Sequence, residues 1–355
     1  MARVVGLAFV ALVATVPMGV LAENWKLETG NRELLHRYES VEPHMGTLVK
    51  ITVYTSGEDE ARRAFRAGFD RIGDLDAVLS DYKPDSGLSR LTRTAVRTPV
   101  AVSRDLFTVL SASQDLAEQT NGAFDVTIGP VIRLWREARR AKRVPDADAL
   151  REAASRTGYR KLHLDPARCT VRLDQPGMAL DVGGIAKGYA ASEALAAISS
   201  LDVRSAMVAI SGDLAMSDAP PGTRGWRISV HDLPGDQMVS QVVELTNAAV
   251  STAGAAEQHL DAGGRRYSHI VAPSTRMGLT EDLTVTVVAR SGLVADGLDT
   301  AMSVLGVERG QALIDARADA AALIVRRTAA GDEILPSARF RSFIRELRGV
   351  VPFPF

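Results

Sequence analysis

The sequence predicts an α+β protein in which helices alternate with short strands. Of its 355 residues, 46% are hydrophobic and 24% are charged, which is typical of a chain that buries a large core. Apolar residues at helical spacing alternate with β-prone segments along most of the chain. Since no linker rich in Pro, Gly or Ser marks a boundary, we expect one domain over residues 23–355.

The elements expected in the first half begin with an alternating strand and a long amphipathic helix. A turn cluster follows over residues 81–87, and then a second helix. The basic stretch 136–143 is predicted to be helical and to present a solvated face. In order, the strand and the two helices are Thr47–Thr55, Glu58–Leu79 and Ser103–Thr120.

The second half is predicted to start with a hairpin over residues 171–181 that leads into a strand. An alanine-rich helix over 187–199 and a helix over 296–305 separate the strands that follow. Those strands are expected at 205–210, 226–231, 241–245, 249–251, 267–271, 283–288 and 321–325. The tail from Arg339 mixes apolar residues with arginines, which indicates a short docking helix.

Charge and cysteine content exclude several function classes. Forty-two basic and forty-three acidic side chains give a formal charge of −1, so no basic field is present to bind nucleic acid. The single cysteine, Cys169, excludes an internal disulfide, a multi-cysteine zinc site and an iron–sulfur cluster.

Residues 1–22 have the pattern of a cleavable signal peptide. Arg3 precedes an apolar run from Val4 to Val16, and a small residue, Ala22, stands before Glu23. The run is shorter than the roughly 20 residues of a membrane span, so a retained anchor is the weaker alternative. A cysteine-poor chain behind such a signal suits the periplasm, and no transmembrane anchor is expected after cleavage.

The first candidate site segment is D-V-G-G-I-A-K-G over residues 181–188, where an acid and two glycines precede a predicted helix. Backbone N–H groups there could meet a phosphate, with Lys187 as a positive charge and Asp181 as an acceptor. An ordinary turn into a helix is the alternative, and the spacing matches neither the P-loop nor the dinucleotide fingerprint.

The second segment is A-D-G-L-D-T-A over residues 295–301. Helical spacing places Asp296, Asp299 and Thr300 together, opposite the apolar stripe. Their oxygens are hard ligands of the kind that magnesium prefers when phosphates complete its shell. Helix capping by Asp296 is the alternative.

The third segment is Y-S-H-I over residues 267–270. His269 follows a short predicted strand and could take or deliver a proton near neutral pH. A packed or hydrogen-bonded strand histidine is the alternative.

Seven stretches, in order, resemble the ApbE family of FAD:protein FMN transferases. They include M-G-T at 45–47, L-S-D-Y-K-P-D-S-G-L-S at 79–89, N-G-A-F-D-V at 121–126 and S-G-D at 211–213. The three segments described above complete the set, and the one that begins at Ala295 extends to Gly306. The resemblance implies an α+β fold related to the T-fold, with two interleaved lobes and FAD in the cleft between them.

The resemblance also implies roles for individual residues. The flavin part of FAD would be held by Met45, Tyr82, Ala123, Phe124 and Asp125. Asp181, Lys187 and Ile270 would line the rest of the dinucleotide, and Mg²⁺ would be bound by Asp296, Asp299, Thr300 and the carbonyl of Gly184. His269 is the expected base for the acceptor hydroxyl, with Asp299 as its rival.

The implied reaction is magnesium-dependent transfer of FMN from FAD to a Thr or Ser hydroxyl, with release of AMP. The acceptor would be an FMN-binding domain of an envelope electron-transfer protein. Three alternatives remain: an FAD pyrophosphatase, a non-catalytic periplasmic FAD-binding accessory protein, and a solute-binding protein. The accessory protein is suggested by Ala253 and Ala272, which stand where many family members carry a hydroxyl and a carboxylate.

Overall fold

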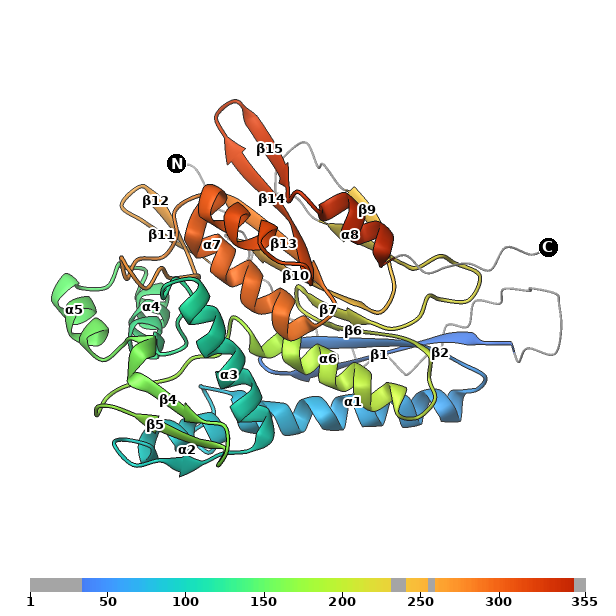
Figure 1. The fold of residues 1–355 in the computed structure, drawn as a ribbon, viewed down its shortest axis with the longest axis horizontal. Coiled ribbons are helices and arrows are strands. Elements are labelled where there is room, and N and C mark those ends of the chain that lie inside the picture. The colour runs from blue at the N-terminus through green and yellow to red at the C-terminus, as the bar shows by residue number, and fades with distance from the viewer. Residues whose placement is uncertain (1–33, 231–240, 255–258, 348–355) are drawn as a thin grey trace, which may run out of the picture.

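The computed structural model describes residues 34–230, 241–254 and 259–347, and confirms the α+β class (Figure 1). The predicted signal peptide lies outside these residues. Eight strands form one sheet in the order β1-β2-β6-β7-β10-β13-β14-β15, and every neighbouring pair is antiparallel. Their bounds are β1 His36–His44, β2 Thr47–Thr55, β6 Ser205–Ile210, β7 Asp213–Met216, β10 Ala248–Gly254, β13 Leu283–Ala289, β14 Ala320–Thr328 and β15 Gly331–Pro336.

Three long helices cover one face of this sheet: α1 (Glu58–Leu79), α6 (Ala186–Ser199) and α7 (Gly292–Asp315). The opposite face is covered by the hairpin of β8 (Trp226–Val230) and β9 (Gln241–Leu245) and by α8 (Phe340–Glu346). Because both faces are covered, β13 is buried along its whole length, which explains its nearly continuous apolar sequence.

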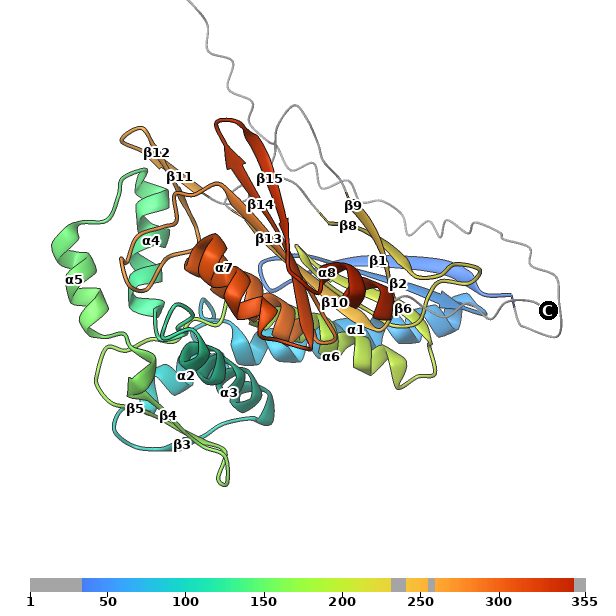
Figure 2. The same ribbon diagram turned by 45° about the horizontal axis from the view of Figure 1, so that its top comes forward.

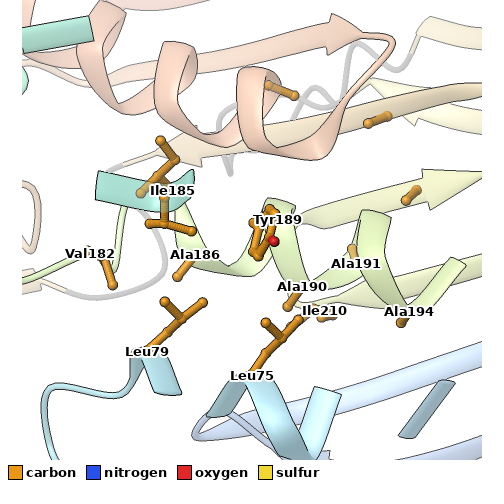
Figure 3. Packing of buried hydrophobic residues seen from close by; sticks show 14 of the residues in the cluster. Leu75, Leu79, Val182, Ile185, Ala186, Tyr189, Ala190, Ala191, Ala194 and Ile210 are labelled. Carbon is orange, nitrogen blue, oxygen red and sulfur yellow. The ribbon is translucent and has the colours of Figure 1, made fainter. Parts of the chain in front are cut away.

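The alanine-rich sequence of α6 follows from its position between α1, α7 and the sheet. Leu75 and Leu79 of α1 point toward Ala186 and Ala190 of α6, as Figure 3 shows. Small side chains allow α6 to approach its neighbours closely, and burial of the larger side chains around them stabilises the layer by about 25 cal/mol per Å² of apolar surface.

A second lobe lies at one end of the sheet (Figures 1 and 2). The chain enters it after α1, returns to the sheet at α6, and leaves again for the β11–β12 hairpin, so the two lobes are interleaved. Its elements are α2 Gly87–Thr94, β3 Val100–Ala101, α3 Arg104–Gln119, α4 Gly129–Ala141, α5 Ala147–Ser155, η1 Tyr159–Lys161, β4 Leu162–Asp165, β5 Thr170–Leu173, β11 His259–Ala262 and β12 Arg265–Ser268.

Two sequence-based predictions about these elements need correction. The hairpin is formed by β4 and β5, and residues 178–181 make a single bridge, Ile128 with Ala179, rather than a strand. The basic helix begins at Gly129, where Pro130 occupies the first turn, and only its last part coincides with the predicted stretch. In the described residues, no helix is long and apolar enough to cross a membrane.

Candidate active site

One pocket, of about 360 Å³, gathers segments of both lobes. Of the residues predicted for the site, all except Tyr82 line it. They are Met45, Ala123, Phe124, Asp125, Asp181, Gly184, Lys187, His269, Ile270, Asp296, Asp299 and Thr300. Segments as far apart in the sequence as Met45 and Thr300 therefore converge on one place, which is what the ordered motifs predicted.

The turn that starts at Asp181 forms one wall of the pocket. Asp181 Oδ1 accepts a hydrogen bond from Gly183 N at 2.9 Å, and its Oδ2 accepts one from Arg136 at 2.8 Å. A Cβ on Gly184 would lie 2.8 Å from Thr300 Oγ1, so only glycine lets this turn pack directly on α7. The contact brings the Gly184 backbone against the Thr300 hydroxyl.

The N-terminal ends of α6 and α7 cross at two glycines. A Cβ on Gly188 would lie 2.1 Å from Gly292 O, so the two backbones are in direct contact. This approach allows Asp296 Oδ2 to accept a hydrogen bond from Gly188 N at 2.8 Å. Since α7 begins at Gly292, Asp296 is not the N-cap of its own helix, and it instead accepts from a backbone N–H in the first turn of α6.

Buried charges gather beside this crossing. Lys187 Nζ donates to Asp213 Oδ2 at 2.6 Å, and the carboxyls of Asp213, Asp296 and Asp299 are each 3% exposed or less. We call these four residues the acid cluster. Burial and the charge of Asp213 raise the pKa of Asp296 to about 7, whereas the neighbouring carboxylates raise the pKa of Lys187.

A serine hydroxyl links two carboxyls of this cluster. Ser251 Oγ lies 2.5 Å from Asp213 Oδ1 and 2.6 Å from Asp299 Oδ2. One hydroxyl proton serves only one of these contacts, so the other requires a proton on a carboxyl group. Burial and the charge of Asp296 raise the pKa of Asp299 well above its usual value.

The acid cluster fits a hard divalent cation. Asp299 Oδ1 is buried and has no hydrogen-bond partner in the described chain, so one carboxylate oxygen remains available. Across the ranges 34–230, 241–254 and 259–347, no three His, Cys, Asp or Glu side chains are arranged to hold a metal. The predicted set needs only two carboxylates, because the Thr300 hydroxyl and the Gly184 carbonyl complete it. Magnesium is often held in this way when substrate phosphates supply further ligands.

The turn between β1 and β2 forms another part of the pocket wall. Met45 and Gly46 connect these strands as a two-residue loop, and both have positive φ, 50° and 74°. This is the type I′ geometry, which suits the twist of a hairpin. Tyr82 lies beside this turn rather than in the pocket lining: its side chain is 54% exposed, and its hydroxyl donates to Asp76 Oδ1 at 3.0 Å.

Asp125 lines the pocket, but its carboxylate is already engaged by protein groups. Its Oδ1 accepts from Thr127 N and Oγ1 at 2.8 and 2.7 Å, and its Oδ2 accepts from Tyr159 N at 3.0 Å. These bonds fix the loop that carries the buried Phe124. Burial nevertheless raises the pKa of Asp125.

His269 follows directly after β12 and lines the pocket with Ile270. The backbone of this segment is held by Ile270 N, which donates to Ser268 Oγ at 3.1 Å. The adjacent Ala272 is buried and bonded through its backbone to Met277. His269, the candidate of the third segment, therefore lies at the pocket wall.

The sequence analysis missed three residues of this site. Arg136 was assigned to a solvated face, yet it pairs with Asp181 and also with Asp81, so that assignment is wrong. Asp213 was part of a matching motif without a role, and Ser251 was not singled out. The S-G-D motif could have identified Asp213 as a site residue. Arg136 and Ser251 are identified only by their contacts in the folded protein.

Comparison with known proteins gives one consistent result. The FAD:protein FMN transferase of Treponema pallidum (strain Nichols) is 33% identical over 301 residues, covering 80% of this chain and 83% of that protein. The Klebsiella pneumoniae (strain 342) enzyme of the same name is 30% identical over 309 residues, covering 84% and 87%.

Solved structures agree with this result. The flavin transferase ApbE from Vibrio cholerae has a TM-score of 0.79 and 29% identity, covering 87% of this chain and 99% of that chain. The apo Pseudomonas stutzeri flavinyl transferase ApbE has a TM-score of 0.77 and 29% identity, covering 90% and 98%. The ApbE family profile matches residues 45–324, which include the whole pocket, and the chain belongs to the ApbE family.

Proposed function

We propose that this protein transfers FMN from FAD to a Thr or Ser hydroxyl of an acceptor flavoprotein and releases AMP. One observation carries the proposal: the acid cluster opens into a pocket lined by the matched motifs, and its Asp299 Oδ1 has no hydrogen-bond partner among the described residues. Relatives that cover most of this chain are named FAD:protein FMN transferases, which supports the same reaction here.

Magnesium fits the hard oxygen ligands of the pocket. Asp296, Asp299, Thr300 and the Gly184 carbonyl would hold it, and Ser251 and Lys187 would hold the neighbouring Asp299 and Asp213 in position. When bound, the ion supplies neutralisation of phosphate oxygens. Binding requires both carboxylates to be ionised, so the raised pKa values of Asp296 and Asp299 oppose it at low pH.

The reaction exchanges one phosphorus–oxygen bond for another. The acceptor hydroxyl oxygen forms a bond to the phosphorus of the FMN half, and the bond from that phosphorus to the bridging oxygen breaks. The bridging oxygen leaves with AMP, and the hydroxyl proton passes to a base. Catalysis then depends on alignment and charge compensation, since no covalent intermediate with the protein is needed.

His269 is our candidate for the base. It lines the pocket from a segment whose backbone is hydrogen-bonded, whereas Asp299 is 2% exposed and linked to Ser251. A carboxyl that holds a cation is less available for the proton, so His269 is favoured over Asp299. Normal transfer rates in His269→Ala would remove this role.

The flavin half of FAD would occupy the side of the pocket formed by Met45, Ala123 and Phe124. Tyr82 is exposed beside that turn, so its ring is available to cover the flavin from outside. Asp125 would act by fixing the loop. Asp181, Lys187 and Ile270 would line the remainder of the dinucleotide.

We further propose that the chain acts in the periplasm on an FMN-binding domain of an envelope electron-transfer protein. The support is the signal-like sequence of residues 1–22, whose structure is outside the described residues. Edman sequencing of the protein from a periplasmic fraction tests this location. An N-terminus at Met1 with all protein in the cytoplasm would contradict it.

The transfer reaction is tested with the mature protein, FAD and an FMN-binding domain that carries the acceptor Thr. We expect AMP release that requires both magnesium and the acceptor, together with flavin that remains on the acceptor after denaturation. An acceptor with Thr→Val is the matched control and should give neither product. AMP release without any acceptor would favour a pyrophosphatase, and tight FAD binding without AMP would favour an accessory protein.

A further inference from the structure

Among the charged side chains that line the pocket, carboxyl groups outnumber positive groups. Lys187 is paired with Asp213, and Arg136 is shared between Asp81 and Asp181. The remaining lining carboxylates leave an excess of negative charge around the space that FAD would occupy. A diphosphate brings two more negative charges, so a positive side chain that is not already engaged would favour its binding in addition to the ion.

Arg139 is such a group. It lines the pocket from α4, one helical turn beyond Arg136, and its side chain is partly buried. Within the described ranges, its guanidinium makes neither a hydrogen bond nor an ion pair. Burial, and then the charges of Arg136 and Arg140, lower the pKa of Arg139, which shows that its positive charge is uncompensated.

The helix that carries Arg139 is held firmly in place. Trp135, four residues before Arg139 on α4, is fully buried, and its indole Nε1 donates to Arg276 O at 2.8 Å. The ring of Trp135 also contacts that of Tyr267, with centroids 5.5 Å apart. Ile132, Arg136 and Arg139 therefore face the pocket as one fixed stripe.

Arg136 connects this stripe to the predicted phosphate region. Its guanidinium contacts Asp181, whose carboxylate also accepts from Gly183 N, immediately before Gly184. An arginine one turn further along the same face is about 5 Å away along the helix axis, within reach of a dinucleotide that spans the pocket. A guanidinium matches the paired oxygens of a phosphate group in geometry as well as in charge.

We propose that Arg139 binds a phosphate of the FAD diphosphate and thereby selects FAD over unphosphorylated flavin. The inference rests on the proposed function only in taking FAD as the ligand. It assigns Arg136 a different task, because that side chain is held by two carboxylates and positions the turn at Asp181. Arg139 would act as a substrate-binding residue without taking part in proton transfer.

Equilibrium binding to the mature protein tests this role, with flavin fluorescence for FAD, FMN and riboflavin and calorimetry for AMP. Arg139→Gln should weaken FAD binding about tenfold or more, as expected for a lost charge-assisted hydrogen bond, and change riboflavin binding less than about twofold. Arg139→Lys should restore part of the affinity. Arg140→Gln, which removes the same charge from the adjacent position outside the pocket, should bind FAD as the wild type does.

FMN and AMP show which phosphate is contacted, since each carries only one of the two. A loss confined to either ligand supports the proposal. Unchanged binding of FAD, FMN and AMP in Arg139→Gln overturns it, as does an equal loss for riboflavin or for Arg140→Gln. A change only in the KM for the acceptor would also overturn it and assign Arg139 to protein docking. AMP release by the wild type tests the proposed function separately. Failure of the role proposed for Arg139 can therefore be distinguished from failure of the proposed transfer reaction.

Discussion

Two of the charged clusters in this molecule differ in how completely their charges are matched. Around Arg71, on α1, the guanidinium bonds Asp105 at 2.5 and 3.0 Å and also pairs with Glu193, while Tyr189 donates to Asp105 at 2.7 Å. The bonds to Arg71 hold the pKa of Asp105 below its usual value. These partners join α1, α3 and α6, and we call them the Arg71 cluster.

In the acid cluster, by contrast, the negative groups are not fully matched by positive ones. Three buried carboxyls share one lysine and one serine proton, and an oxygen of Asp299 has no partner in the described chain. The pKa of Asp299 and that of Asp296 are raised rather than lowered. A cluster that only stabilises the fold does not need more carboxyl groups than positive charges. A cation site does need this excess of negative charge. The excess therefore distinguishes a binding role for the acid cluster from the structural role of the Arg71 cluster.

The largest effect that we expect follows from Asp296→Asn. Loss of a charged ligand should lower the rate of AMP release at least about a hundredfold, because metal neutralisation of the phosphates is worth several kcal/mol. The folded state should be as stable as the wild type or more stable without magnesium, since a buried negative charge is removed. Transfer assays and thermal melts in EDTA measure the two quantities. If Asp296→Asn lost activity because it unfolded, the acid cluster would have a structural role, as the Arg71 cluster does.

For the Arg71 cluster the expected pattern is the opposite. Arg71→Ala leaves Asp105 and Glu193 as neighbouring carboxylates without their cation, and should lower the free energy of unfolding by about 2 kcal/mol. The rate of AMP release per folded molecule should stay within about twofold of the wild type. Urea unfolding together with transfer assays below the melting range tests this. A selective loss of kcat would show that the Arg71 cluster is coupled to the site.

How much of the fold could be predicted from the sequence depends on whether an element is determined by neighbouring residues or by contacts between distant ones. The helix Glu58–Leu79 was predicted with its observed bounds, because its apolar spacing and acidic first turn are local signals. The start of α7 was placed four residues late, because the contact of Gly292 with Gly188 is tertiary. β1 and β15 were not predicted: both are strands at the edges of the sheet, and β1 is exposed along much of its length.

The candidate site shows the same limit. The ordered motifs predicted which residues converge, but the pairing of Arg136 with Asp181 joins side chains 45 positions apart. Similarly, Ser251 bonds Asp213 and Asp299 from a strand that has no unusual composition. Local periodicity carries no information about such partners, so the balance of charge could be assessed only in the folded protein.

A smaller effect should appear in the pH dependence of stability. The pKa of Asp296 is about 7 in the fold and about 3.9 in an unfolded chain, so between these values the folded state binds more protons. The contribution of Asp296 to stability therefore falls as pH rises from about 4 to about 7. Magnesium, which needs ionised ligands, should reverse this loss and stabilise more strongly at pH 8 than at pH 5.5.

Thermal melts with magnesium and with EDTA across this pH range measure the effect. The raised pKa of Lys187 lies outside the window, and the carboxyl of Asp105 with its lowered pKa is already ionised there, so neither should contribute. Asp296→Asn is the matched control and should lose most of the difference. Equal stabilisation by magnesium at both pH values would show that the ion does not bind at the acid cluster.

The smallest effect is expected for an ion pair that belongs to neither cluster. Arg326 and Glu333 pair at 2.5 Å across β14 and β15, with side chains 36% and 45% exposed. Water screens such a pair, so Arg326→Ala should change the free energy of unfolding by less than about 0.5 kcal/mol and leave transfer unaffected. Urea unfolding in parallel with Arg71→Ala provides the measurement. A loss as large as that of Arg71→Ala would mean that the number of ion pairs, rather than their burial and completeness, determines what a charged cluster contributes to this fold.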